Sequence, residues 1–266
     1  MRFFYLLPVL LSLTANAQGD WDTYLMEVNN KPLSVVVDLG LAQKAPQKER
    51  PFVIIVRTKI NKPQTNGLPG ESEAAVMDNL EDSLVYYMEQ KSGALYAGRF
   101  TQRGLREFYF YTLDTVDYLF TAATAFKNFE SYQWLCQAKE DKKWSNYFEV
   151  LYPPDKEMER IQNRRTVDNL KRNGDALKTA RQIDHNIYFK TKTSRELFLK
   201  EIKESGFKFP HQPDDDPGSG EYPYKLKLFR DDIPSYTQID RICLYLWELA
   251  RKFNGRYDGW ETFVVK

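Results

Sequence analysis

The chain has 266 residues, of which 42% are apolar, 15% aromatic and 28% charged. This composition provides enough apolar material for packed cores and excludes a chain that is disordered throughout. Lysine and arginine number 38 against 37 aspartate and glutamate, so the net charge of +1 creates no overall field that would attract nucleic acid or an anionic membrane. At roughly 100–200 residues per domain, the length favours two domains.

The N-terminus has the pattern of a secretory signal peptide, residues 1–17. Arg2 precedes an apolar run at residues 3–13, and the Ala-Asn-Ala sequence at residues 15–17 supplies the small side chains that a signal peptidase requires. The run is too short for a membrane span, which needs ~20 residues, and we expect no span elsewhere. We therefore predict cleavage near Ala17 and a periplasmic or secreted protein. The alternative is a buried first strand or helix.

The first domain, predicted at residues 18–153, carries the patterns of an antiparallel sheet with packed helices. Alternating or β-branched runs indicate strands, and apolar residues at helical spacing indicate helices. Turns at residues 29–32 and 102–104 would make hairpins, and Gly93 would end the first helix. In chain order we expect strands at residues 20–28, 33–39, 52–57, 94–101, 105–112 and 131–139, and helices at residues 71–90 and 115–126, the second capped by Asp114 or Thr115.

The second domain is predicted at residues 183–266, after two prolines at positions 153 and 154 and a charged linking helix within residues 154–182. Its element order is β-α-β-β-α-β, which is typical of a ferredoxin-like sandwich. The fold class is therefore α+β with two domains. We expect strands at residues 183–190, 207–211, 222–230 and 256–265, and a linking helix at residues 158–173. One further helix would be capped by Thr193 with Glu196 and end at Gly206, and another would be capped by Ser235 with Gln238 and end near Phe253.

Residues 257–263 (Tyr-Asp-Gly-Trp-Glu-Thr-Phe) closely resemble the end of the regulator of ribonuclease activity B family, and residues 184–189 and 206–207 match its opening strand and a helix-to-strand corner. The resemblance covers about residues 160–266 and implies a protein that binds and inhibits ribonuclease E. This chain departs from that family by its signal peptide and by the lack of long acidic segments, since the acidic runs in this domain are the short ones at residues 214–216 and 231–232. Because ribonuclease E is cytoplasmic and fold does not imply function, we carry over the fold and not the target.

The first domain, about residues 20–152, is similar to the domain-of-unknown-function family 695. The matching stretches are residues 21–24, 67–69, 98–101 and 106–111. This resemblance implies no known activity.

Three arginines on one predicted hairpin are the candidate ligand-binding residues: Arg99, Arg103 and Arg106. Guanidinium groups grouped in this way can clamp a carboxylate or a phosphate, which predicts a small polar or anionic ligand. The alternative is a set of surface salt bridges, for example to Glu107.

Catalytic carboxylates are a further possibility on the first predicted helix. Asp78 and Asp82 are one turn apart there, with Glu81 and Glu89 nearby, which is also the pattern of an ordinary polar helix face. The aromatic residues 108–111 could form a stacking platform, although aromatics on a strand more often pack in a core or in cross-strand pairs.

Histidine and cysteine chemistry has little support in this sequence. The two histidines, His185 and His211, fall on strands that are not neighbours in the expected sheet, and neither has a ligand at metal-binding spacing, so we predict no metal and no cofactor. We expect a partly buried His185 and a His211 on a loop. Cys136 has no histidine in its own domain, and Cys243 lies on an apolar helix face as a core thiol. A disulfide between the two cysteines is the alternative.

The sequence therefore favours a non-catalytic, exported binding or regulatory protein over an enzyme. Its partner would be an unknown protein or a small polar or anionic ligand, and we expect no nucleic acid. Two alternatives stay open: a hydrolase-type enzyme that uses first-domain carboxylates and arginines, and a cytoplasmic ribonuclease E regulator whose N-terminus is not cleaved.

Overall fold

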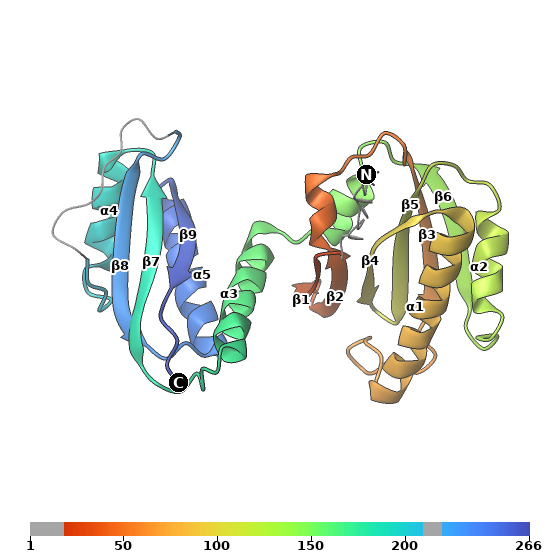
Figure 1. Ribbon diagram of the computed structural model, residues 1–266, viewed down its shortest axis with the longest axis horizontal. Coiled ribbons are helices and arrows are strands. Elements are labelled where there is room, and N and C mark those ends of the chain that lie inside the picture. The colour runs from red at the N-terminus through yellow and green to blue at the C-terminus, as the bar shows by residue number, and fades with distance from the viewer. Residues whose placement is uncertain (1–18, 210–219) are drawn as a thin grey trace, which may run out of the picture. The chain divides into compact units, whose positions relative to one another are not determined.

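The computed structural model describes residues 19–209 and 220–266. The predicted signal peptide, His211 and the acidic residues 214–216 lie outside the described residues. The chain divides into two compact units, of which the first ends at Tyr152 and the second begins at Pro153 (Figure 1). Each unit combines antiparallel strands with helices, which confirms the α+β fold class. No helix within the described ranges combines the length and the hydropathy needed to cross a membrane.

The first unit contains a six-stranded antiparallel sheet with the strand order β1-β2-β4-β5-β3-β6. Asn29 and Asn30, and likewise Arg103 and Gly104, have positive φ angles, as two-residue hairpin turns of type I′ require. Both predicted hairpins are therefore confirmed. The strands are β1 (Trp21–Val28), β2 (Lys31–Asp38), β3 (Phe52–Lys59), β4 (Leu95–Gln102), β5 (Leu105–Thr112) and β6 (Trp134–Glu140).

Two α-helices, α1 (Glu71–Ser92) and α2 (Tyr118–Phe126), share the core of the first unit with one face of the sheet (Figure 1). Gly93 ends α1 with a φ of 62°, as predicted. The predicted caps of the second helix are wrong, because the Asp114 carboxylate accepts a hydrogen bond from the Val116 N–H in a turn that precedes α2. The core residues come mainly from α1, β3 and β5: Met77, Leu80, Leu84, Met88, Ile54, Val56, Phe108 and Phe110.

The opposite face of this sheet is covered by the segment that follows β6. A 3-10 helix, η1 (Leu39–Gln43), and a π-helix, η2 (Tyr147–Leu151), are the short helices of this unit. Tyr111 stacks on Trp144 with 3.8 Å between ring centroids, and its hydroxyl accepts a hydrogen bond from the Tyr147 N–H. All four aromatic residues at 108–111 are at most 3% exposed, so the core interpretation is right and the stacking platform is wrong.

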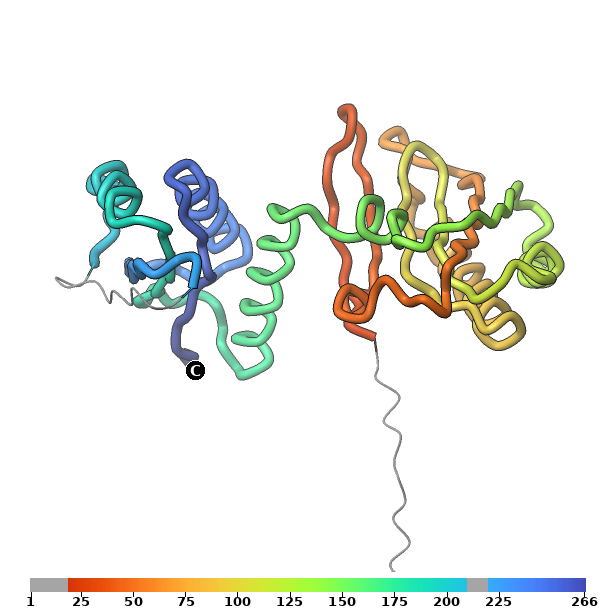
Figure 2. The backbone as a smooth tube through the Cα atoms, turned by 90° about the horizontal axis from the view of Figure 1, so that it is seen from above, coloured from red at the N-terminus to blue at the C-terminus, as the bar shows by residue number. Residues whose placement is uncertain are grey.

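The second unit is a three-stranded antiparallel sheet, ordered β8-β7-β9, with helices packed on it. Figure 2 shows α4 and α5 on the same side of the strands. The predicted strand at residues 207–211 is reduced, within its described part, to a bridge between Lys208 and Phe229. This bridge places the segment beside β8 at the edge of the sheet, which is the position of the second strand in a ferredoxin-like sandwich. The elements are α3 (Asp155–Arg172), β7 (Arg181–Phe189), α4 (Lys192–Ile202), β8 (Tyr224–Asp232), α5 (Tyr236–Lys252) and β9 (Gly255–Glu261).

The helix caps of the second unit agree only in part with the prediction. Ser235 caps α5 by accepting a hydrogen bond from the Gln238 N–H at 3.4 Å, as expected. Thr191, and not Thr193, caps α4, with its hydroxyl accepting from the Ser194 N–H at 3.1 Å. Thr191 is extended and stands one turn before Ser194, which is the geometry that a cap needs.

The core of the second unit places Cys243 among the apolar residues of α5, fully buried as predicted. Helix α3 contributes Val167 and Leu170 to the same core. Both Cys136 and Cys243 are free thiols, so the disulfide considered from the sequence is not formed.

Candidate functional site

The structure brings two of the three predicted arginines together. Arg99 on β4 pairs with Phe108 of β5, and Arg106 on β5 pairs with Thr101, so both arginines occupy the sheet face that α1 covers. Arg103 lies apart from them, exposed at the tip of the hairpin.

Arg99 and Arg106 meet two carboxylates of α1. Arg106 Nη1 lies 3.2 Å from Asp78 Oδ1 and 3.6 Å from Glu81 Oε2, while Arg99 Nε lies 2.5 Å from Glu81 Oε2. Burial and the neighbouring charge of Arg99 lower the pKa of Arg106, and Glu81 and Asp78 oppose this effect by stabilising the charged guanidinium. We call these four residues the α1 ion-pair cluster. Glu107, the partner considered from the sequence, instead binds Arg57.

Arg103 lines a separate cavity of about 230 Å³ at the tip of the β4–β5 hairpin, together with Lys31. The remaining lining residues come from the 63–67 loop and from Gly104, and none of them is acidic. Gly67 is required in this loop because a Cβ atom there would approach Arg103 Cα to 2.8 Å. Anion binding stays a prediction for all three arginines. Asp78 and Glu81 offset the charges of Arg99 and Arg106, whereas no acidic residue lines the cavity beside Arg103.

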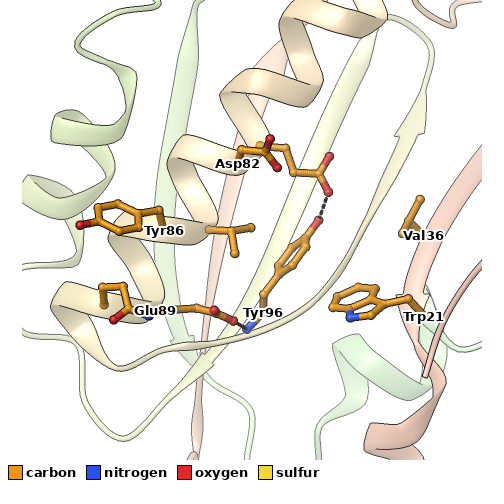
Figure 3. A pocket seen from close by; sticks show the side chains of 9 residues that line it. Trp21, Val36, Asp82, Tyr86, Glu89 and Tyr96 are labelled. Carbon is orange, nitrogen blue, oxygen red and sulfur yellow. Dashed lines mark hydrogen bonds between the residues drawn. The ribbon is translucent and has the colours of Figure 1, made fainter. Parts of the chain in front are cut away.

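A groove of about 570 Å³ lies beside the α1 ion-pair cluster, between α1 and the β1, β2 and β4 strands (Figure 3). It forms because β1 and β2 continue the sheet beyond the strands that pack in the helix-covered core. Asp82, Tyr86 and Glu89 present one stripe of α1 toward it, at the i, i+4 and i+7 positions. The lining residues are Trp21, Val36, Glu81, Asp82, Val85, Tyr86, Glu89, Gln90 and Tyr96.

Tyr96 organises the polar atoms at the centre of this groove. Its hydroxyl donates to Glu81 Oε1 at 2.7 Å, and its backbone N–H donates to Glu89 Oε1 at 3.3 Å (Figure 3). Burial, and then the charge of Glu81, raises the pKa of Tyr96 well above its usual value, so the phenol stays protonated and remains a donor. Trp21 stacks on Tyr96 with 5.3 Å between the ring centroids. The sequence pattern indicated the carboxylates of α1 but neither of these two aromatic residues.

The second unit presents a different kind of surface. Alternate residues of β7 are fully buried toward α4 and α5, and those between them, including Asp184, Asn186 and Tyr188, are partly exposed on the other side of the sheet. Lys225 of β8 and Arg256 of β9 lie over the Tyr188 ring at 5.8 Å and 5.4 Å from its centroid. We call the surface formed by Asp184, Asn186, Tyr188, Lys225, Lys227 and Arg256 the open sheet face.

His185 and Cys243 belong to a buried chain of polar groups and not to a site. His185 is fully buried, more than the sequence suggested, and its Nδ1 lies 2.8 Å from the Tyr257 hydroxyl. That hydroxyl donates to Cys243 Sγ at 3.2 Å. Burial lowers the pKa of His185 to about 4 and raises the pKa of Cys243, so the first is neutral and the second protonated at neutral pH. Across residues 19–209 and 220–266, no group of acidic, His and Cys side chains has metal-binding geometry.

Family comparisons assign the two units separately. Residues 19–152 match the family described as Family of unknown function (DUF695), and residues 160–262 match the family described as Regulator of ribonuclease activity B. The second match supports a regulatory or binding role. No curated protein matches the chain. A crystal structure of an unknown protein from Galdieria sulphuraria is 9% identical, with a TM-score of 0.23 and coverage of 81% of this chain and 100% of that one. A similarity of that size supports no structural argument.

Proposed function

The chain belongs to the Family of unknown function (DUF695), and we propose that it is an exported, non-catalytic binding protein that regulates a protein partner through its second unit. The observation that carries this proposal is the match of residues 160–262 to Regulator of ribonuclease activity B, because a family described in this way acts by regulating a ribonuclease and not as the enzyme itself. The partner of the present chain is a different one if the chain leaves the cytoplasm.

The open sheet face is the surface on which we place the partner. Its side chains stand on strands, so they are held rigidly, and Lys225 and Arg256 bracket an aromatic ring. Lys225 has no carboxylate within ion-pair distance among the described residues, whereas Lys227 is 2.9 Å from Asp184 and 3.0 Å from Glu261. Arg256 lies 3.4 Å from Asp258, and Lys190, beside Tyr222, pairs with Glu221, so Lys225 is the cation of this face on which the argument rests. Cations and tyrosines in this arrangement suit an acidic segment of a protein partner.

The side chains that could carry out catalysis already contact other residues of the protein or are buried, which supports a non-catalytic role. The Glu81 oxygens contact Tyr96 and Arg99, and His185 and Cys243 lie within a core. Perturbed pKa values mark functional sites only when the group can reach a substrate, and the perturbed His185 and Cys243 are fully buried.

Site-specific crosslinking tests the proposed partner surface. A photo-crosslinking amino acid at position 188 lies on the open sheet face, and the same group at position 245 lies on α5, where Tyr245 is 44% exposed. We expect one discrete adduct from position 188 in the cell that makes the protein, none from position 245, and loss of the adduct with Lys225→Glu. Equal labelling from both positions, or an adduct that survives Lys225→Glu, would contradict the proposal.

Export is supported by the pattern of residues 1–17 and is tested by intact mass. A mature chain that starts at Gln18 in the periplasmic or secreted fraction is the expected result. A full-length cytoplasmic chain would overturn export and would make regulation of a ribonuclease the leading function, in line with the second family match.

A hydrolase is the second candidate, because the α1 ion-pair cluster borders the groove and sets Asp78 and Glu81 beside arginines. Such an enzyme would hydrolyse a chromogenic ester or phosphate, and Glu81→Gln would abolish that activity while the protein stays folded. Turnover that is absent from the parent chain, or unchanged in Glu81→Gln and Arg99→Ala, excludes this candidate.

A further inference from the structure

The groove beside α1 has two carboxylates with acceptor oxygens available for a ligand. Asp82 makes no ion pair within the described ranges, and Glu89 uses Oε1 for the Tyr96 N–H, which leaves Oε2 available. Glu81 differs, because Tyr96 contacts one of its oxygens and Arg99 the other. The groove therefore presents the negative charge of Asp82 and Glu89, while the nearby arginines are offset by carboxylates of the α1 ion-pair cluster.

The position of Glu89 makes the lower part of this groove more negative. Glu89 lies in the last turn of α1, and its carbonyl accepts a hydrogen bond from the Gly93 N–H at 3.1 Å. The C-terminal end of a helix carries a partial negative charge, so a carboxylate there is unfavourable unless a cation approaches it. Lys91 in the last turn and Arg50, which donates to the Gly93 carbonyl at 2.7 Å, offset part of this charge. A bound cation would relieve this repulsion.

Aromatic side chains form the remaining wall of the groove. Trp21 is 41% exposed and Tyr86 is 57% exposed, which is high for large aromatic residues that line one cavity. The face of a tryptophan or tyrosine ring attracts an ammonium or guanidinium group and also packs well on methylene chains. Carboxylates and aromatic rings around one cavity together select an organic cation.

We propose that this groove binds a linear aliphatic polyamine, with one ammonium group at Asp82, another at Glu89 and the connecting methylenes against Trp21 and Tyr96. The two carboxylates are seven residues apart on α1, which is about 10 Å along a helix axis, so they fit the two ends of an extended ligand and not a single ammonium ion. This site lies in the first unit and is independent of the partner surface proposed for the second.

Titration of the full chain with spermidine tests the site directly, by calorimetry and by the fluorescence of the tryptophans. We expect binding that weakens as salt rises, because the contacts are charged. Asp82→Asn and Glu89→Gln should each weaken binding about tenfold, which corresponds to one hydrogen bond to a charged group. Glu71→Gln, at the other end of α1, is the matched control and should bind spermidine as the parent does.

The comparison ligands decide between a cation site and a general apolar groove. We expect monoacetylated 1,8-diaminooctane to bind at least tenfold more weakly than the diamine, and 1,8-octanediol to give no signal. Equal affinity for the diol, equal affinity in the Asp82→Asn and Glu89→Gln variants, or no response to millimolar spermidine would overturn the proposal. A neutral sugar that binds without salt dependence would also overturn it and assign the groove to a saccharide.

Discussion

The two units build surfaces of opposite charge beside antiparallel sheets. In the first unit, carboxylates of α1 and exposed aromatics line a groove. In the second, Lys225 and Arg256 flank Tyr188 on the open sheet face, where Lys227 and Arg256 also have carboxylate partners. The groove takes its charge from a helix next to the sheet, whereas the open sheet face takes its charge from alternate residues of the strands. The near-neutral total of the chain is therefore compatible with two local surfaces for which we propose different ligands.

The largest expected effect is the difference in stability loss between substituting a buried arginine of the first unit and an exposed arginine of the second. Arg106→Ala empties a buried position and removes the contacts of this guanidinium to Thr101, Asp78 and Glu81, which should destabilise the first unit by about 3–5 kcal/mol. Arg256→Ala should change the stability of the second unit by less than about 0.5 kcal/mol, since surface pairs contribute little. Amide hydrogen exchange of β5 and β9 measures both effects.

Arg103→Ala is the control on the same hairpin as Arg106, and we expect it to leave β5 exchange unchanged. Equal losses for the Arg103 and Arg106 variants would contradict the distinction between a structural and an exposed arginine.

The second prediction concerns pH and the second unit. Burial, and then the charges of Asp240 and Asp258, raise the pKa of Glu159 to about 7. The folded state thus binds this proton more tightly than the unfolded state, and stability falls as pH rises from about 4.5 to about 7. Glu159→Gln should therefore stabilise the second unit by about 3 kcal/mol above pH 7 and have no effect below pH 4.5. Urea unfolding at pH 5 and pH 8 measures the difference.

Glu204→Gln serves as the control for Glu159→Gln, because Glu204 is exposed in the same unit. A Glu159→Gln variant that is no more stable than the parent at pH 8 would show that burial does not destabilise the charged form there.

The third prediction tests the charge of the open sheet face without the native partner. A short glutamate-rich peptide should bind the second unit, and Lys225→Ala should weaken this binding about five- to tenfold, because one charge-assisted contact is lost. Fluorescence anisotropy of a labelled peptide measures the affinity, with Lys208→Ala as the control outside the open sheet face. Equal affinities for the Lys225 and Lys208 variants would contradict the assignment of the surface.

The smallest expected effect is that of a reductant. Because both cysteines are free, dithiothreitol should leave the unfolding temperature of each unit within about 1 °C. Scanning calorimetry measures the unfolding temperature, and a clear decrease on reduction would reveal a disulfide that contradicts the structure.

Local signals in the sequence were sufficient for most elements of both units. The hairpin turn at residues 29–30 and the helix end at Gly93 depend on a few neighbouring residues, and both are as predicted. Of the predicted strand at residues 207–211, the described part, residues 207–209, makes a single bridge from Lys208 to Phe229 of β8, and a pairing of that kind depends on a strand about twenty residues away in the sequence. The Thr193 cap failed because Thr191, two residues earlier, offers the same chemistry.

The α1 ion-pair cluster and the groove could be predicted only in part from the sequence, because their residues come together through tertiary packing. The carboxylates on α1 and the arginines on the β4–β5 hairpin were each evident in the sequence, but no local sequence pattern indicates that they form ion pairs with one another. One signal was available: Arg106 alternates with Phe108 and Phe110, so it had to face the core and required a buried partner. Trp21 carries no such signal, since its place in the groove depends on how β1 continues the sheet.

The most direct test of the opposite charges is one NMR titration of the full chain with two probes, spermidine and a glutamate-rich peptide. We expect spermidine to shift the amides of Trp21, Tyr96 and the second half of α1, and the peptide to shift those of β7, β8 and β9. Shifts by both probes in the same unit, or by neither probe in either unit, would contradict the account.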